Sequence, residues 1–353
     1  MKIFHIYIHT IVALVIFFSS TVSCKKKDLK IEKTYPQNKY SEIFSTHPSG
    51  DLNLYDISKS WNNRIYPLDE VHKDYVLKMN QLDGFSESPT PYKKMNEIRK
   101  VFQKISIEEP IELKRIKNKY IYGIYIVSNL GGTGLTGFIF DGRKSMGGFI
   151  LIDGDLISRK ANQWITAKES SVFQEALNSK INIKIASNKD NTIETAMEYI
   201  LLHELGHIIA QSMNILPDQR DKYRKFDEFE FSKKVWIDEE NSIYDESIFR
   251  IRKELQFYDD ESIFFIDKDS LTIYNQLEKT SFPTLYSAMN PDDHFAESFV
   301  SYIHLYLYKH PWELQIDTPK LDLFFKNGIT LARCSREKEF IKKLLIDCKK
   351  NLK

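Results

Sequence analysis

The feature that most constrains this chain is the segment YILLHELGHIIA, from Tyr199 to Ala210. Apolar residues stand on every side of the helix that this segment would form, a pattern typical of a helix buried around its whole circumference. Ionisable side chains are seldom buried without a partner, because an apolar environment disfavours the charged form. His203, Glu204 and His207 therefore need partners within the core.

The two histidines are one helical turn apart, so both rings lie on one face and can turn a nitrogen toward the same ion. Glu204 adjoins His203, where its carboxylate can reach water at a metal without being a ligand. The alternative is two core histidines hydrogen-bonded to backbone and a paired glutamate, and such a pentamer arises by chance about one time in a hundred. Gly206 favours the metal, because a glycine inside a helix costs about 1 kcal/mol and indicates close approach of another element.

A catalytic zinc site needs three protein ligands and one open position. The residues that follow directly, 211–220, contain no histidine. Farther along, NPDDHFAESFVSY predicts a helix whose apolar stripe is bordered by Glu297. This helix offers a carboxylate for the site.

The pentamer HELGH with a downstream FAESF resembles the glutamate zincins, and among them the lethal-factor-like bacterial peptidases. The strands LGGTGLTGFIFD and GGFILID are similar to those that precede the motif helix in some exported bacterial metallopeptidases. The resemblance implies a Zn²⁺ cofactor with Glu297 as the third ligand and Tyr286 as the donor to the oxyanion. It covers Ile121 to Tyr306 in patches, and a longer segment than usual separates the two helical motifs.

Other polar residues near these motifs have competing interpretations. His294 is an alternative ligand, or else a histidine that supports a ligand or lies on the surface. In the polar stretch between the motifs, a solvated face is expected from Asp238, Glu239 and Glu240. At the start of the second motif helix, Asp292 and Asp293 are expected to cap the helix.

The expected fold is α+β and zincin-like, with a small sheet before the HExxH helix and a mainly helical C-terminal part. Residues rich in β-branched and aromatic types between Tyr120 and Asp153 predict the sheet, and INIKIA predicts a further strand. Helices are expected from Pro91 to Phe102, in KESSVFQEAL, in FSKKVW, in YDESIFRIRKEL, after Pro291 and after Arg336, and Asn191 is the expected start signal of the motif helix. The expected division is 1–23 signal peptide, 24–90 tether and polar region, and 91–350 zincin-like metallopeptidase domain.

The first residues predict export. A short apolar run, IVALVIFF, follows Lys2 and His5 and is shorter than the roughly 20 residues of a membrane-spanning helix. The sequence TVSC then resembles a bacterial lipobox, which implies a lipid anchor at Cys24 on the cell envelope, with an ordinary cleaved signal peptide as the alternative. In an oxidising compartment Cys334 and Cys348 either pair or remain two inert thiols.

Lys+Arg 50 against Asp+Glu 49 gives a formal charge of +1, so nothing favours nucleic acid as a partner. The expected activity is zinc-dependent hydrolysis of a peptide or protein, with Glu204 as the general base. Gly147 and Gly148 would let the strand GGFILID pair with an extended substrate. The alternatives are a catalytically inactive zinc-binding surface lipoprotein that acts as a binding module, and a hydrolase for a non-peptide bond.

Overall fold

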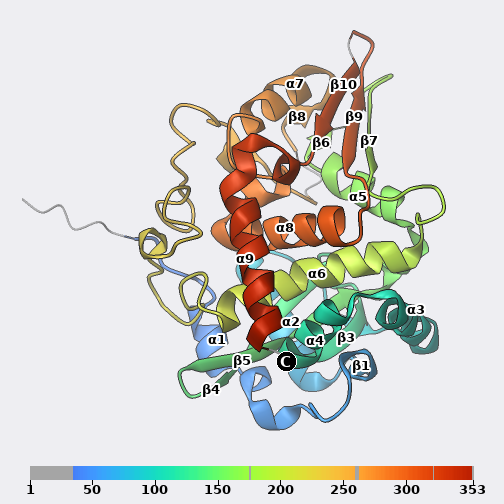
Figure 1. Cartoon of the computed structure of the whole chain (residues 1–353), viewed down its shortest axis with the longest axis vertical. Helices are drawn as coiled ribbons and strands as arrows, with labels where there is room; N and C mark the ends of the chain where they lie inside the picture. Colours follow the sequence, from blue (N-terminus) through green and yellow to red (C-terminus); the bar gives the residue numbers. More distant parts are fainter. Residues whose placement is uncertain (1–34, 175, 259–261, 321, 352–353) are drawn as a thin grey trace, which may run out of the picture. The chain divides into compact units, whose positions relative to one another are not determined.

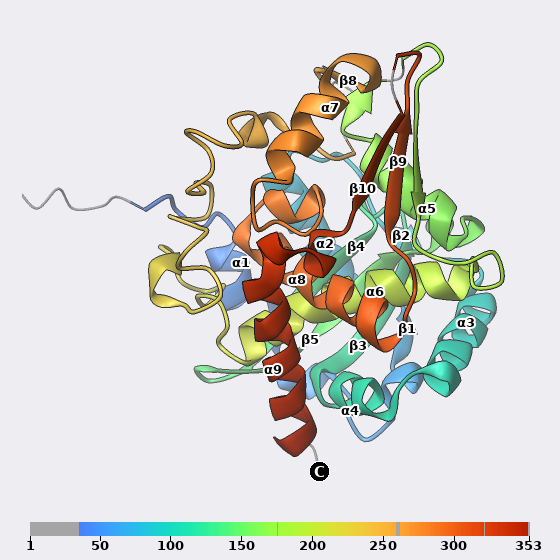
Figure 2. The same ribbon diagram turned by 45° about the horizontal axis from the view of Figure 1, so that its top comes forward.

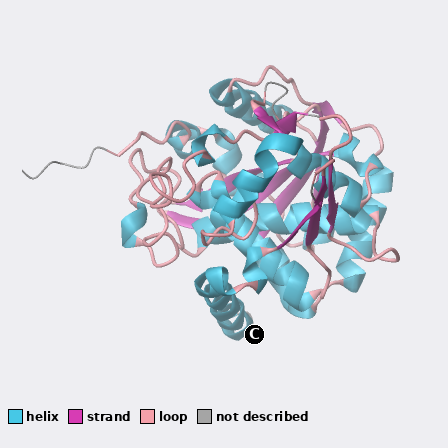
Figure 3. Ribbon diagram, turned by 90° about the horizontal axis from the view of Figure 1, so that it is seen from above, coloured by secondary structure: helices cyan, strands magenta, loops and turns pink. Residues whose placement is uncertain are grey.

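The computed structural model describes residues 35–174, 176–258, 262–320 and 322–351. The predicted signal peptide and Cys24 lie outside these residues. The described residues form one compact unit, with helices and strands mixed as expected for an α+β fold (Figure 3). Among the described residues, no helix is both long enough and apolar enough to cross a membrane.

The main sheet has the strand order β1-β3-β5-β4. Its strands are β1 (Ile65–Pro67), β3 (Ile121–Ser128), β5 (Lys144–Asp153) and β4 (Gly134–Asp141), and the short β2 (Thr90–Pro91) pairs with the end of β3. Strands β1, β3 and β5 run parallel. A tight turn, in which Gly142 has a φ of 57°, joins β4 to β5, and these two strands pair antiparallel. The predicted sheet with a hairpin is therefore confirmed.

Edge pairing by GGFILID is wrong, because β5 lies inside the sheet and both of its edges are occupied. The two glycines of β5 instead let neighbouring backbone approach. A Cβ atom at Gly147 would lie 2.5 Å from the carbonyl oxygen of Tyr120, and one at Gly148 would lie 2.4 Å from that of Gly137. Among the described strands, β1 and β4 form the two edges of this sheet, and the outer edge of β4 is free apart from an isolated bridge between Phe140 and Asp51.

The HELGH segment lies on α6 (Ile193–Ser212), which packs against β4 and β5 and against α8 (Pro291–Tyr302) (Figure 1). Burial around almost the whole of α6 confirms the prediction from its apolar pattern. Gly206 meets α8, since a Cβ atom there would lie 2.8 Å from the Cα atom of Ala296. Thr192, not Asn191, caps the helix through its hydroxyl.

The region expected to be a tether is largely folded from Tyr35 onward. It contains α1 (Ser41–Thr46), α2 (Glu70–Asp83) and β1, and Trp61 and Tyr75 are buried. The helix expected from Pro91 begins later, as α3 (Met95–Glu108), and is followed by α4 (Ile111–Tyr120). Aromatic side chains scattered through this region pack into the core. Their spacing follows neither the helix nor the strand period, so hydrophobic periodicity does not predict these elements.

The C-terminal half contains further strands. A second sheet joins β10 (Asp322–Lys326), β9 (Glu313–Asp317) and β7 (Lys180–Lys184), and appears upright beside the helices in Figure 2. The helix expected in KESSVFQEAL is instead the end of α5 (Ala161–Ser170) followed by β6 (Phe173–Gln174), which pairs with β8 (Phe264–Phe265). Helices α7 (Ile266–Leu277) and α9 (Ser335–Asn351) complete it.

The segment between α6 and β8 is irregular. Helices predicted in FSKKVW and YDESIFRIRKEL are absent from its described residues, where only short 3₁₀ turns occur at Phe226–Glu228 and Arg252–Glu254. Two buried arginines hold it in place. Arg224 donates to Asp292 at the start of α8, and Arg252 donates to the carbonyl oxygens of Ala288 and Met289.

Cys334 and Cys348 are both buried and free, so the alternative of two unpaired thiols holds. The thiol of Cys334 donates to the carbonyl oxygen of Ser281. Cys348, on the last helix α9, packs against Met213, which directly follows α6.

Candidate metal centre

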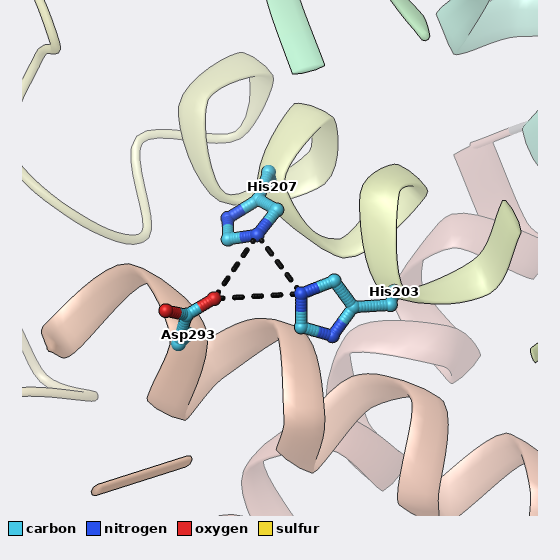
Figure 4. Close-up of side chains that lie close together, drawn as sticks. All are labelled: His203, His207 and Asp293. Atoms are coloured by element: carbon cyan, nitrogen blue, oxygen red, sulfur yellow. Dashed lines mark hydrogen bonds and ion pairs between the residues drawn. The ribbon is translucent and has the colours of Figure 1, made fainter. Parts of the chain in front are cut away.

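Three ligand-type atoms meet between α6 and α8 (Figure 4). The Nε2 atoms of His203 and His207 are 3.2 Å apart, and Asp293 Oδ1 lies 3.4 Å from the first and 3.5 Å from the second. One helical turn separates the two histidines, and α8 brings the carboxylate across because Gly206 allows the helices to touch. This group could hold a metal ion.

Glu297 lies outside this triangle. Its Oε1 is 3.1 Å from Nδ1 of His203, on the opposite side of the ring from Asp293. The same oxygen accepts a hydrogen bond of 2.8 Å from Nζ of Lys168, and Oε2 accepts one of 2.9 Å from the hydroxyl of Thr284. The position expected for the third ligand is therefore taken by Asp293, one helical turn earlier on α8.

Asp293 was expected to cap α8, but Asn290 does so by accepting a hydrogen bond from the Asp293 backbone N–H. This leaves the Asp293 carboxylate to face the histidines. Asp293 and Glu297 are four residues apart and share one face of the helix, so both carboxylates approach His203. That spacing was the available signal for Asp293.

The carboxylates make this point of the structure favourable for positive charge. Burial would lower the pKa of His203, but the carboxylates of Asp293 and Glu297, 3.4 and 3.1 Å from its ring nitrogens, raise the pKa to about 9. Burial likewise would raise the pKa of Glu297, yet Lys168 and His203 lower it to about 2. A cation placed between the three ligand atoms would contact Asp293 directly and be attracted by the charge of Glu297 behind His203.

Glu204 points toward the free edge strand. Its Oε2 accepts a hydrogen bond of 2.7 Å from the hydroxyl of Thr136 on β4. A Cβ atom at Gly134 would lie only 2.5 Å from Glu204 Oε1, so the strand approaches the carboxylate closely there. Glu204 thus lies between the motif helix and the open edge of the sheet.

Tyr286 lies in a 3₁₀ turn just before α8. Its ring centroid is 5.6 Å from that of His203, and Nζ of Lys168 lies 3.8 Å from the ring centroid. Burial and the nearby carboxylate of Asp293 raise its pKa above the ordinary value, which keeps the phenol protonated. The structure therefore brings the Tyr286 ring beside His203, and its role as donor to the oxyanion stays a prediction.

The other sequence candidates lie elsewhere. His294 is fully buried and its Nδ1 accepts a hydrogen bond of 3.2 Å from Trp236, so it faces the core behind α8. The expected solvated face is wrong for two of its residues: Asp238 is buried, and Glu239 forms an ion pair of 2.9 Å with Arg224.

Two adjoining cavities of about 690 and 610 Å³ meet at the metal group, and His203, Glu204, Tyr286 and Asp293 line both. The larger extends toward Arg224 and Glu239 of the irregular segment. The smaller extends toward Trp164 and Lys168 of α5 and the glycine-rich stretch before β4. Together the two cavities run from the irregular segment, across the candidate site, to α5.

Comparison of the chain with protein-family models, with curated proteins and with solved structures gives no match. The interpretation of the site therefore depends on its own geometry.

Proposed function

We propose that the chain is a zinc-dependent peptidase of zincin-like fold, with His203, His207 and Asp293 as the metal ligands. The donor set of two imidazole nitrogens and one carboxylate oxygen is one that zinc prefers. Tetrahedral ligands at about 2.0 to 2.1 Å from zinc lie about 3.3 Å from one another. The three separations of 3.2, 3.4 and 3.5 Å match this value, and this match carries the proposal.

Glu297 has a supporting role in this proposal. A histidine that binds metal through Nε2 is oriented by an acceptor at Nδ1, which fixes the tautomer and raises the basicity of the ligand nitrogen. Glu297 Oε1 stands at that place, 3.1 Å from His203 Nδ1. It therefore orients a ligand rather than acting as one.

A bound zinc ion supplies Lewis acidity, which lowers the pKa of water and polarises the carbonyl group under attack. Glu204 accepts the proton of the attacking water and then donates it to the leaving amine. Thr136 holds the Glu204 carboxylate through its hydroxyl. In this proposal, Tyr286 donates a hydrogen bond to the oxyanion that develops on the scissile carbonyl.

The edge of β4 suits an extended peptide. The Asp153 N–H donates to the Thr133 carbonyl oxygen, so the alternation of an antiparallel pair turns the backbone groups of Gly134 and Thr136 away from β5. The Thr136 carbonyl oxygen already accepts a hydrogen bond from Tyr75 on α2. The groups left to pair with a substrate are the backbone N–H and carbonyl of Gly134 and the N–H of Thr136. A substrate strand would pair there, beside Glu204.

The same proposal includes export and lipid anchoring at Cys24, based on the N-terminal sequence alone. The substrate would then be a peptide or protein of the cell envelope or its surroundings.

The test uses the purified full chain in detergent, with zinc content measured by elemental analysis and cleavage measured on a peptide library. Glu204→Gln is expected to retain zinc and lose cleavage by at least about a hundredfold, the lower range for a general base. The matched control is Glu194→Gln at the start of the same helix, where the side chain pairs with Lys104 and is remote from the ligands.

Equal cleavage by the wild type and Glu204→Gln would contradict the peptidase proposal. Stoichiometric zinc with no cleavage by either protein would favour the zinc-binding module instead. Asp293→Ala is expected to abolish stoichiometric zinc binding, and full zinc content in this variant would overturn the ligand set.

A further inference from the structure

A buried lysine connects two parts of the candidate site. Lys168, near the end of α5, is 5% exposed, and its Nζ lies 2.8 Å from Glu297 Oε1 and 3.8 Å from the centre of the Tyr286 ring. Glu297 in turn contacts Nδ1 of His203. One ammonium group thus contacts both the carboxylate behind a metal ligand and the aromatic ring beside it.

We propose that Lys168 is a positioning residue that acts through Glu297 on His203 and through the ring face on Tyr286. This inference rests on the proposed function, but its effect on metal binding does not require catalysis. The four groups come from four separate places: α5, α6, the turn before α8, and α8 itself. Lys168 contacts two of them, Glu297 and Tyr286, and reaches His203 through Glu297.

The physical reason is the burial of the carboxylate. Glu297 is 1% exposed, and an unpaired carboxylate there would be costly because water cannot solvate it. Lys168 Nζ holds Oε1 in place at 2.8 Å, so that this oxygen lies 3.1 Å from His203 Nδ1 and leaves Nε2 of that ring free to bind metal. Without Lys168, the Glu297 side chain would turn toward other partners, and His203 would lose the group that orients it.

The ring contact has a separate consequence. An ammonium group over an aromatic face is attracted by the ring quadrupole, more strongly where water is excluded. Phe257 packs edge-on against the same tyrosine, with ring centroids 4.8 Å apart. Lys168 and Phe257 together hold Tyr286 in the cavity.

The experiment measures zinc affinity by competition with a chromophoric chelator in the full chain. Lys168→Met, which removes the charge but keeps a long side chain, is expected to weaken zinc binding by about 10- to 100-fold, the range found for residues that support metal ligands. If peptide cleavage is present, kcat is expected to fall more than KM rises, because Tyr286 is displaced.

The matched control is Lys117→Met. Lys117 is fully buried and pairs with Glu109 and Glu198 at 2.8 Å each, so its loss also removes a buried ion pair, but away from the ligands. Its zinc affinity is expected to stay within about threefold of wild type. Equal weakening by both variants would show a general loss of stability and would overturn the proposal.

A double-mutant cycle with Glu297→Gln tests the route of the effect. If Lys168 acts through Glu297, adding Lys168→Met to Glu297→Gln weakens zinc binding by much less than it does in the wild type. Fully additive effects would overturn the proposal.

If Lys168→Met does not fold, Lys168→Gln removes the same charge with a polar side chain, and the same loss of affinity is expected. Unchanged affinity would overturn the proposal. Weakened zinc binding in a chain that cleaves no peptide would support Lys168 while refuting the peptidase function.

Discussion

Gly134→Ala tests whether the close contact between the edge strand and Glu204 matters for catalysis. The new Cβ atom would lie 2.5 Å from Oε1, 2.8 Å from Cδ and 3.0 Å from Cγ of Glu204. Ordinary contact begins near 3.4 Å, so the carboxylate must move by about 1 Å, away from its hydrogen bond with Thr136. A misplacement of about 1 Å can cost about a hundredfold in rate. We therefore expect kcat/KM to fall by about 10- to 100-fold.

The assay compares initial cleavage rates of one fluorogenic peptide with zinc affinity. Zinc affinity is expected to stay unchanged, because Gly134 contacts the base and not the ligands. Gly132→Ala is the matched control two residues earlier, since its Cβ atom would come no nearer than 3.9 Å to any neighbour. A Gly134→Ala enzyme as fast as the Gly132→Ala enzyme would refute a catalytic role for Glu204 at its observed position.

Three further outcomes are expected. Arg252→Met should lower the free energy of unfolding by about 3 to 5 kcal/mol in denaturant titrations, because it leaves its partner Asp245 as an uncompensated charge; an unchanged midpoint would contradict this role. Burial raises the pKa of Glu169 to about 7. Its neutral form therefore stabilises the fold fully below about pH 4.5, and this contribution is lost as the pH rises through about 7. As the pH rises between these values, the free energy of unfolding of Glu169→Gln should accordingly increase by up to about 3 kcal/mol relative to that of the wild type, measured in thermal melts. A difference in stability between the two proteins that does not change with pH would refute this prediction. Burial also raises the pKa of Cys334 to about 12, so native alkylation mapped by mass spectrometry should spare this thiol, and rapid labelling would argue against its burial.

The elements that the sequence predicted are those whose pattern repeats along the chain. The apolar circumference of α6 and the β-branched runs of β3, β4 and β5 report burial directly, and both were found. The segment between α6 and β8 was not predicted, because its order depends on contacts with residues distant in sequence. Arg224 and Arg252 are examples, since each satisfies groups near α8 that no local pattern reveals.

Which strand is the open edge also required the fold. Glycines and apolar residues in β4 and β5 look alike in sequence, and only the strand order leaves β4 outermost. The sequence does not encode strand neighbours in its local period, because the same alternation suits a central or an edge strand.

For the candidate site, the sequence by itself determined the two histidines and Glu204, because helical spacing alone puts them on adjoining positions of one buried helix. It also brought Tyr286 and the FAESF helix into consideration. The tertiary structure decided which carboxylate of that helix meets the two Nε2 atoms. Asp293 and Glu297 share a face, so the choice between them depends on how α8 slides along α6, and the contact of Gly206 with Ala296 sets that position. The same packing brought in Lys168, whose ammonium group contacts Glu297 from another helix.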